Sequence, residues 1–194
     1  MERFVARGKR GIVSAETRDG IRVAVKKKRP ESSAIGRLEI EAKWIKELNK
    51  HSIGPRFVAF EEGKLVTEFI EGELIGDYVR THDAKAVRKV ILNVLEQCRR
   101  MDEIGVNKEE MHRPVKHIIV RDDKPVLIDF ERCHYTIRPK NVTQFIQFLT
   151  SSDFGSRIKD KGISIDAARL REAAEEYKQN PDKRSFRNIR KQIA

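Results

Sequence analysis

The chain has 194 residues and a mass of 22.5 kDa, which favours one domain or two small lobes and excludes a large multidomain enzyme. Lysine and arginine total 41 against 30 aspartate and glutamate, so the formal net charge of +11 favours an anionic partner. Hydrophobic residues make up 39% of the chain, enough to build a core, which excludes a disordered protein.

The cysteines and the hydropathy pattern bear on the redox state and the compartment. Cys98 and Cys133 lie far apart and form neither a CxxC motif nor a zinc spacing with histidine, so we expect reduced, buried thiols. No apolar run approaches the roughly 20 residues that a membrane-spanning helix needs, and residues 1–7 do not begin a signal peptide. The sequence therefore predicts a cytoplasmic protein with no membrane partner.

The N-terminal part of the chain predicts strands around one helix. Residues 3–28 contain short β-branched groups separated by glycines, and Asp19-Gly20 is a strong hairpin signal. Residues 33–49 carry apolar side chains at spacings of three and four, the period of an amphipathic helix. Residues 57–60 and 65–70 then predict a second strand pair.

The remaining residues predict mainly helices. Residues 84–104 place one apolar stripe on a long helix, and Gly105 follows as a C-terminal signal. Two short apolar runs joined by a polar turn, at 118–120 and 125–128, predict a hairpin. Further helices and a last basic segment are expected at 141–149, 166–177 and 183–191. The predicted class is α+β with two lobes.

A glycine-rich segment at residues 6–13 is the first chemical motif. It resembles the phosphate loop G-x-G-x-x-G-x-V, with Ala6 at the first glycine position and Gly8, Gly11 and Val13 following. Backbone amides approach phosphate oxygens only where side chains are absent, which suits both glycines. An ordinary hairpin turn is the alternative interpretation.

Two further segments suggest nucleotide chemistry. Residues 23–26 resemble the V-A-I-K strand, and Lys26, fifteen residues after Gly11, could reach phosphates as a point charge. Residues 126–131 resemble the D-F-G segment, with Glu131 in place of glycine. A carboxylate such as Asp129 at the end of an apolar strand is costly unless paired, and a Mg²⁺ that bridges phosphates would satisfy it. A solvated lysine and a turn-capping aspartate are the competing interpretations.

In this order the segments, over about residues 3–150, resemble a compact protein-kinase-like fold with a small β-rich N-lobe and a short, mostly helical C-lobe. The resemblance implies lobes at residues 1–72 and 73–194, with ATP and Mg²⁺ as cofactors. It also implies that a helix glutamate holds Lys26. Glu41, fifteen residues later, suits this role, and Glu39 is the alternative, although it lies off that helix face.

The strand at residues 65–72 resembles the one that runs into the hinge of this family. The resemblance implies that Thr67 occupies the gatekeeper position and that backbone groups from Glu68 to Ile70 hold adenine. An edge strand that leaves the sheet fits the same residues.

The catalytic loop departs from the family pattern, because no aspartate occupies the usual base position. If residues 118–120 are the following strand, His117 takes the place of the metal-binding asparagine, although oxygen ligands suit Mg²⁺ better. Counting back five residues reaches His112, and Glu110 is the nearest acid that could act as the base, if the loop is two residues longer than usual. The other alignment reads residues 112–114 as a shifted H-R-D and leaves no acid at all. Lys116, in the R-P-x-K-H segment, is a third catalytic candidate.

Within the family, the chain resembles the small atypical kinases of the RIO and KEOPS-subunit type and a group of compact archaeal predicted serine/threonine kinases. It carries no A-P-E motif and no peptide-docking subdomain after Asp129, so we expect no broad peptide substrate. Such kinases act as ATPase-like switches or on one bound partner, which is what the resemblance implies.

The basic C-terminal segment suggests a second partner. Residues 178–191 hold six cations and one acid, and Arg187, Arg190 and Lys191 fall within about one helical turn. With Phe186 among them, we expect contact with RNA, the ribosome or tRNA-modification machinery, and no feature indicates DNA specificity. A solvated terminal helix is the alternative.

Two functions therefore stay open. The first is an ATP-dependent serine/threonine kinase or ATPase, and the second is a pseudokinase-like scaffold that senses nucleotide or binds RNA without phosphoryl transfer. A third interpretation, a basic RNA-binding domain without a nucleotide site, predicts no response to ATP.

Overall fold

The computed structural model describes residues 3–7, 11–29 and 36–193. The chain divides into two compact units. The first comprises the chain up to Glu71 together with Ile128–Arg132, and the second comprises Gly72–Leu127 and the chain from Cys133 onward. The short segment 128–132 returns to the first unit and brings Asp129 into it.

The first unit is built on an antiparallel sheet with strand order β1-β2-β3-β5-β4. The predicted hairpin at Asp19-Gly20 is confirmed, since both residues have positive φ (49° and 77°) between β2 and β3. Glu62 and Gly63 likewise turn the chain between β4 and β5. The strands are β1 Arg3–Arg7, β2 Gly11–Arg18, β3 Ile21–Lys28, β4 Phe57–Glu61 and β5 Lys64–Glu68.

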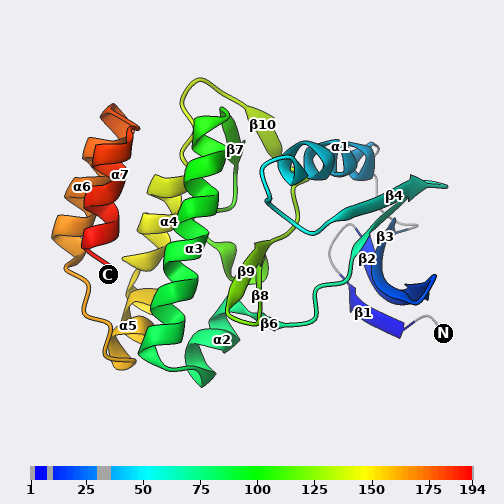
Figure 1. Ribbon diagram of the computed structural model, residues 1–194, viewed down its shortest axis with the longest axis horizontal. Helices are drawn as coiled ribbons and strands as arrows, with labels where there is room; N and C mark the ends of the chain where they lie inside the picture. The colour runs from blue at the N-terminus through cyan, green and yellow to red at the C-terminus, as the bar shows by residue number, and fades with distance from the viewer. Residues whose placement is uncertain (1–2, 8–10, 30–35, 194) are drawn as a thin grey trace. The chain divides into compact units, whose positions relative to one another are not determined.

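Helix α1 (Arg37–Asn49) packs against strands β3, β4 and β5 of this sheet (Figure 1). The stripe predicted from the sequence is confirmed, because Ala42, Ile45 and Leu48 are buried. Glu41 is buried on the same helix, whereas Glu39 is exposed. The helix therefore carries one acid into the interior of the first unit.

The second unit contains two small sheets. In one, the strand order is β6-β8-β9, and the predicted hairpin is confirmed with Asp122 and Asp123 at its turn, both at positive φ. In the other, β7 pairs with β10. The strands are β6 Glu73–Leu74, β7 Val106–Lys108, β8 Ile118–Arg121, β9 Lys124–Leu127 and β10 Cys133–Tyr135.

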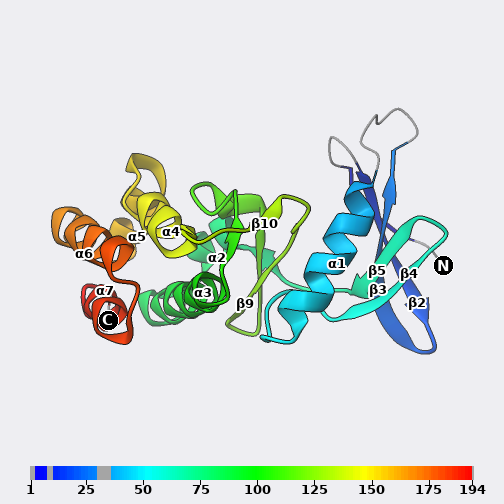
Figure 2. The same cartoon turned by 90° about the horizontal axis from the view of Figure 1, so that it is seen from above.

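Helices form the rest of the second unit around α3, whose buried side chains run along its whole length. Figure 2 shows α6 and α7 side by side, and these two helices pack together. The helices are α2 Ile75–Thr81, α3 Ala84–Glu103, α4 Asn141–Leu149, α5 Ser152–Asp160, α6 Ala167–Gln179 and α7 Lys183–Lys191. In the described part of the chain, no helix is both long enough and apolar enough to span a membrane.

The structure confirms one sequence-based expectation about side chains and contradicts another. Cys98 and Cys133 are free and buried, as expected. Phe186 was expected to accompany the basic face of α7, and this is wrong: its ring is 1% exposed and lies under the Arg99 guanidinium, 4.8 Å from its centroid. Successive residues of a helix point in different directions, so Phe186 lies on the buried face of α7 while Arg187 lies on the exposed face.

Candidate functional site

Lys26 lies at the centre of a charged cluster in the first unit. Its Nζ is 2.7 Å from Oε2 of Glu41 and 3.1 Å from Oδ1 of Asp129. Strand β3 carries the lysine, helix α1 carries the glutamate, and the returning segment 128–132 carries the aspartate. Three residues that are far apart in the sequence are thus brought together.

The electrostatics of the cluster favour a charged lysine. Burial lowers the pKa of Lys26, but the carboxylates of Glu41 and Asp129 outweigh that effect and raise it above its usual value. Burial also raises the pKa of Glu41, an effect that the Lys26 ammonium opposes. The lysine side chain keeps 21% of its surface exposed, so a ligand can reach a cation that is already fixed in place.

Backbone geometry places Asp129. It follows strand β9 and adopts a left-handed conformation with φ 64°, which few non-glycine residues do. The next residue, Phe130, is fully buried and anchors the segment. Glu131 replaces the glycine of the family pattern, and its carboxylate lies 3.7 Å from Arg37 of helix α1. The strained backbone is therefore held by packing on one side and by an ion pair on the other.

The glycine-rich segment is described only in part. Gly8 lies outside the described residues. Gly11 begins β2, and a Cβ there would stand 3.2 Å from the carbonyl oxygen of Lys27 and 3.6 Å from Cε of Lys26. Val13 is the direct cross-strand partner of Lys26. A side chain at Gly11 would therefore crowd the Lys27 carbonyl, whereas its Cβ would make only an ordinary van der Waals contact with Lys26.

The predicted hinge residues lie at the end of strand β5 and just after it. Thr67 is buried and pairs with Ala24. The N–H of Glu68 donates to the Arg56 carbonyl (2.8 Å), and the N–H of the following residue, Phe69, also donates within the sheet. Within the described residues, this leaves Ile70 as the hinge residue whose N–H is not committed to the sheet.

The predicted catalytic-loop residues lie in the second unit. Glu110 Oε2 is 3.4 Å from Nδ1 of His117, so the candidate base and the candidate metal ligand face each other. His112 and Lys116 are exposed, and Lys116 closes a short 3-10 turn, Pro114–Lys116. The chain therefore offers an acid and an imidazole as one pair, with the exposed side chains of His112 and Lys116 nearby in sequence.

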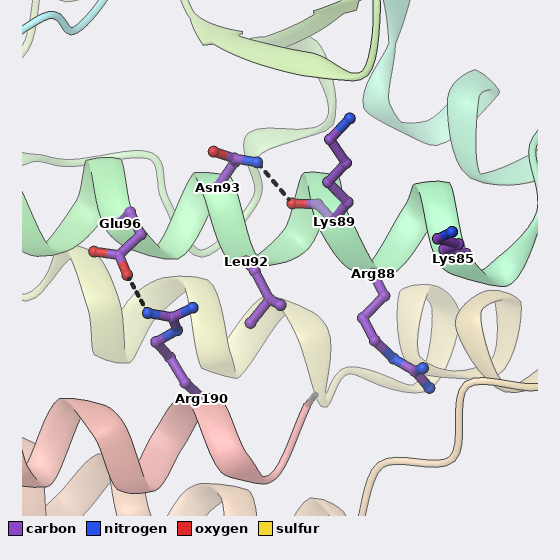
Figure 3. Close-up of a pocket in the computed structure, with 7 residues that line it drawn as sticks. All are labelled: Lys85, Arg88, Lys89, Leu92, Asn93, Glu96 and Arg190. Atoms are coloured by element: carbon purple, nitrogen blue, oxygen red, sulfur yellow. Dashed lines mark hydrogen bonds and ion pairs between the residues drawn. The ribbon is translucent and has the colours of Figure 1, made fainter.

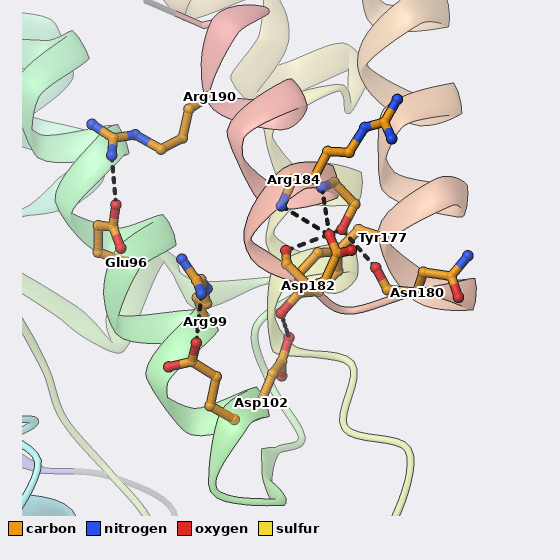
Figure 4. Close-up of polar contacts among 10 residues, drawn as sticks. Glu96, Arg99, Asp102, Tyr177, Asn180, Asp182, Arg184 and Arg190 are labelled. Atoms are coloured by element: carbon orange, nitrogen blue, oxygen red, sulfur yellow. Dashed lines mark hydrogen bonds and ion pairs between the residues drawn. The ribbon is translucent and has the colours of Figure 1, made fainter.

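A second buried carboxylate, Asp102 in the second unit, was missed from the sequence. Its Oδ1 accepts hydrogen bonds from the backbone N–H (3.0 Å) and the side-chain amide (2.7 Å) of Asn141. Its Oδ2 accepts from the Val142 N–H at 3.3 Å. The same oxygen accepts from the Tyr177 hydroxyl, also at 3.3 Å (Figure 4). Burial raises the pKa of Asp102 to about 6, although these hydrogen bonds oppose the shift.

The Asp102 cluster also reaches the segment that precedes the catalytic loop. The Asn141 side chain donates to the carbonyl of Val106 (2.6 Å) and accepts from the N–H of Lys108 (2.7 Å). A polar residue on the buried stripe of α3, one turn after Cys98, was the sequence signal that could have identified Asp102.

The chain resembles a curated protein in sequence over part of its length. No protein-family model matches the chain. The uncharacterized protein MJ1211 of Methanocaldococcus jannaschii is 28% identical over 114 residues, which cover 57% of this chain and 97% of that protein.

Two solved kinase domains resemble the structure. The autoinhibited serine kinase domain of the giant muscle protein titin superposes with a TM-score of 0.67 at 13% identity, covering 100% of this chain and 82% of that chain. The kinase domain of PF14_0431 superposes with a TM-score of 0.60 at 14% identity, covering 70% of this chain and 51% of that chain. The chain thus spans about half the length of the latter. The similarity establishes that this protein has a protein-kinase-like fold.

Proposed function

We propose that the chain is an ATP-dependent phosphotransferase of the atypical serine/threonine kinase type, or an ATPase, related to the RIO and KEOPS-subunit kinases. The observation that supports it most is the single lysine, Lys26, held between a buried helix glutamate and the strand-end Asp129 on a kinase-like fold. The group that accepts the γ-phosphate of ATP would be a serine or threonine hydroxyl, or water.

The residues of the cluster fit a magnesium-bound nucleotide. A lysine ammonium has three donors, and two of those of Lys26 are used by Glu41 and Asp129. Among the described residues the third has no acceptor, so it can donate to a phosphate oxygen. Carboxylate oxygen is the ligand type that Mg²⁺ prefers, which makes Asp129 the principal metal ligand and His117 a weaker candidate.

Each protein group has one task in this proposal. Bound ATP would supply the phosphoryl group, and Mg²⁺ would neutralise its charge. Lys26 binds the α- and β-phosphates, and Glu41 fixes the ammonium in position. Gly11 and Val13 form the strand beside the phosphates, while Thr67, Glu68 and Ile70 bind the base. In the second unit, Glu110 accepts the proton of the acceptor hydroxyl, with His112 and Lys116 as the other candidates.

A second function, a nucleotide-sensing scaffold without phosphoryl transfer, is favoured by one observation. The Glu110 carboxylate lies 3.4 Å from a ring nitrogen of His117, and a carboxylate paired with that ring is not available to accept the proton of a substrate hydroxyl. Binding and turnover separate the two functions, because both require the nucleotide site and only the first requires a base.

Thermal unfolding with Mg-ATP tests the nucleotide site. A ligand present at 100 times its Kd stabilises the folded state by about 2.7 kcal/mol, so the wild-type melting temperature should rise. Lys26→Met and Asp129→Ala should each abolish the rise. Lys27→Met, a change of the neighbouring lysine on the opposite strand face, is the matched control and should keep it. No rise in the wild type, or a rise retained in both site variants, would refute the proposal.

Turnover on the same samples tests the transfer step. We expect phosphate release or radiolabel transfer from [γ-³²P]ATP, and a loss of at least about 10²-fold in Glu110→Gln if that residue is the base. A wild-type rate in Glu110→Gln would point to His112 or Lys116. Binding without any turnover in the wild type would establish the scaffold function.

A further inference from the structure

A basic groove lies in the second unit, between helices α3 and α7. Its volume is about 380 Å³, within the range of roughly 300–1,000 Å³ that is typical of ligand sites. Figure 3 shows the side chains that form it. The lining residues are Lys85, Arg88, Lys89, Leu92, Asn93, Glu96 and Arg190.

The charge of the groove is strongly positive. Four of its seven residues are cations, and Glu96 is the one acid among them. Glu96 is engaged by Arg190 at 2.9 Å, and Lys89 lies 3.4 Å from Asp123. Within the described residues, Lys85 and Arg88 have no acidic partner. The groove therefore holds cations that an anionic ligand could pair with.

The arrangement of these cations costs helix stability. Lys85 stands in the first turn of α3, where the positive end of the helix dipole disfavours a cation, and the one acid at this helix end is the N-cap Asp83, which is bonded to the Ala86 N–H. Lys85 also has like-charged neighbours three and four positions later, at Arg88 and Lys89, and such pairs are destabilising. A sequence selected for helix stability alone would not concentrate positive charge at this end, so a binding role is the better explanation.

The extent of the charge and the apolar floor define the ligand class. The exposed Arg187 and Lys191 extend the positive surface along α7 beyond the groove, which suits an elongated polyanion rather than a single phosphate. Leu92 gives the groove an apolar face for a sugar or base. None of the seven lining residues, all described, is aromatic, so the groove would bind the backbone of a strand without stacking its bases.

Asn93 favours ribose. Its Nδ2 donates to the carbonyl of Lys89 at 3.0 Å, which leaves Oδ1 as an acceptor at the groove edge. A 2′-hydroxyl can donate to this oxygen, whereas deoxyribose has no such group. We propose that the α3–α7 groove binds the sugar-phosphate backbone of single-stranded RNA. This proposal does not depend on the nucleotide site of the first unit.

Fluorescence anisotropy of the full chain with labelled 12-mer oligo(U), without ATP, tests the groove. Lys85→Glu with Arg88→Glu should weaken binding at least 10-fold. The double variant should also lower the slope of log K against log salt by about 0.7 for each phosphate that it no longer neutralises. Lys43→Glu with Lys159→Glu removes the same charge from exposed positions on α1 and α5 and is the matched control. Circular dichroism establishes that both variants are folded.

Three results would overturn the proposal. The first is a groove variant that binds oligo(U) no more weakly than the control, because binding would then reflect only the net charge of the chain. The second is equal affinity for oligo(dT), which would remove the ribose assignment. The third is displacement of oligo(U) by poly-glutamate at equal charge concentration, which would indicate an acidic protein partner. A preference for oligo(U) that falls in Asn93→Ala would support it.

Discussion

Among the described residues, each unit of the molecule buries one carboxylate, and the two are satisfied in opposite ways. In the first unit, Glu41 is paired with the ammonium of Lys26, which also contacts Asp129. In the second, Asp102 has no cation at hydrogen-bond distance among the described residues and accepts four hydrogen bonds from neutral donors instead. The first arrangement is a charge cluster. The second is a structural joint, by which we mean a hydrogen-bonded cluster that holds neighbouring helices together.

The difference indicates which cluster suits ligand binding and which stabilises the fold. Two of the three donors of the Lys26 ammonium are used by Glu41 and Asp129, which leaves the third for a ligand, and the two carboxylates keep the ammonium charged. The donors around Asp102 are backbone N–H groups, a side-chain amide and a phenol, and they tie α4 and α6 to α3. We therefore expect changes at Asp102 to affect the free energy of unfolding, and changes at Glu41 to affect ligand binding.

The largest expected effect is on stability, from Asp102→Ala. The change leaves several buried donors of Asn141, Val142 and Tyr177 without an acceptor, and each such loss costs about 1–3 kcal/mol, partly offset by rearrangement. We expect the free energy of unfolding to fall by about 3 kcal/mol, measured by urea denaturation.

The control for this change is Asp153→Ala on α5, an exposed acid paired with Arg157 one turn later. A surface pair of this kind contributes about 0.5 kcal/mol or less. Equal losses in the two variants would contradict the distinction between a buried joint and a surface charge.

Much of the first unit was predictable from the sequence because local signals and tertiary packing agree there. The Asp19-Gly20 turn and the β-branched runs were sufficient for the strands, and the apolar period of α1 indicated which glutamate faces inward. Lys26 and Glu41 were therefore correctly brought together. The role of these residues in nucleotide binding stays a prediction.

The second unit was predicted only in part from the sequence. The bounds of α4 and α7 were predicted, but α2 and α5 were missed. Helix α2 has seven residues with Gly76 in its first turn, and α5 carries only Phe154 and Ile158 as buried apolar residues around Gly155. Neither offers enough periodic signal. The Asp102 joint was missed because its partners come from α4 and α6 and share no local pattern.

The next effect in size is on binding, from Glu41→Gln. The amide keeps the shape of the side chain and can still accept from Lys26, but it removes the charge that fixes the ammonium. We expect Mg-ATP affinity to fall about 10-fold, or 1.4 kcal/mol, with a change of less than about 1 kcal/mol in unfolding free energy. Isothermal titration calorimetry and urea denaturation measure the two.

Glu39→Gln is the matched control, since Glu39 is exposed two positions earlier on α1. It should leave both quantities unchanged. If Glu41→Gln instead lost several kcal/mol of stability and kept wild-type affinity, the Lys26 cluster would be a structural joint like that of Asp102.

A smaller effect is expected on the pH dependence of stability. The folded pKa of Asp102 is raised to about 6 from 3.8, so the folded state binds more protons than the unfolded state between these values. The contribution of the Asp102 carboxyl to the free energy of unfolding is complete below pH 3.8 and is lost as the pH rises through 6. Between pH 5 and 7 the wild type should lose about 1 kcal/mol relative to Asp102→Asn, in which this titration is absent. Parallel stability curves for the two proteins would show that the Asp102 carboxyl is not perturbed.

The smallest effect tests the one hydroxyl donor among the four donors to Asp102. The Tyr177 hydroxyl lies 3.3 Å from Asp102, and burial followed by the nearby carboxylate raises the pKa of this tyrosine, so it stays a neutral donor. Tyr177→Phe removes one donor of four and keeps the ring packed against Phe186. We expect a loss of about 0.5–1 kcal/mol in urea denaturation and an Asp102 pKa above its wild-type value, because a hydrogen bond to the charged form is lost. A stability loss as large as that of Asp102→Ala would mean that the ring, rather than the carboxylate, holds α6 against α3.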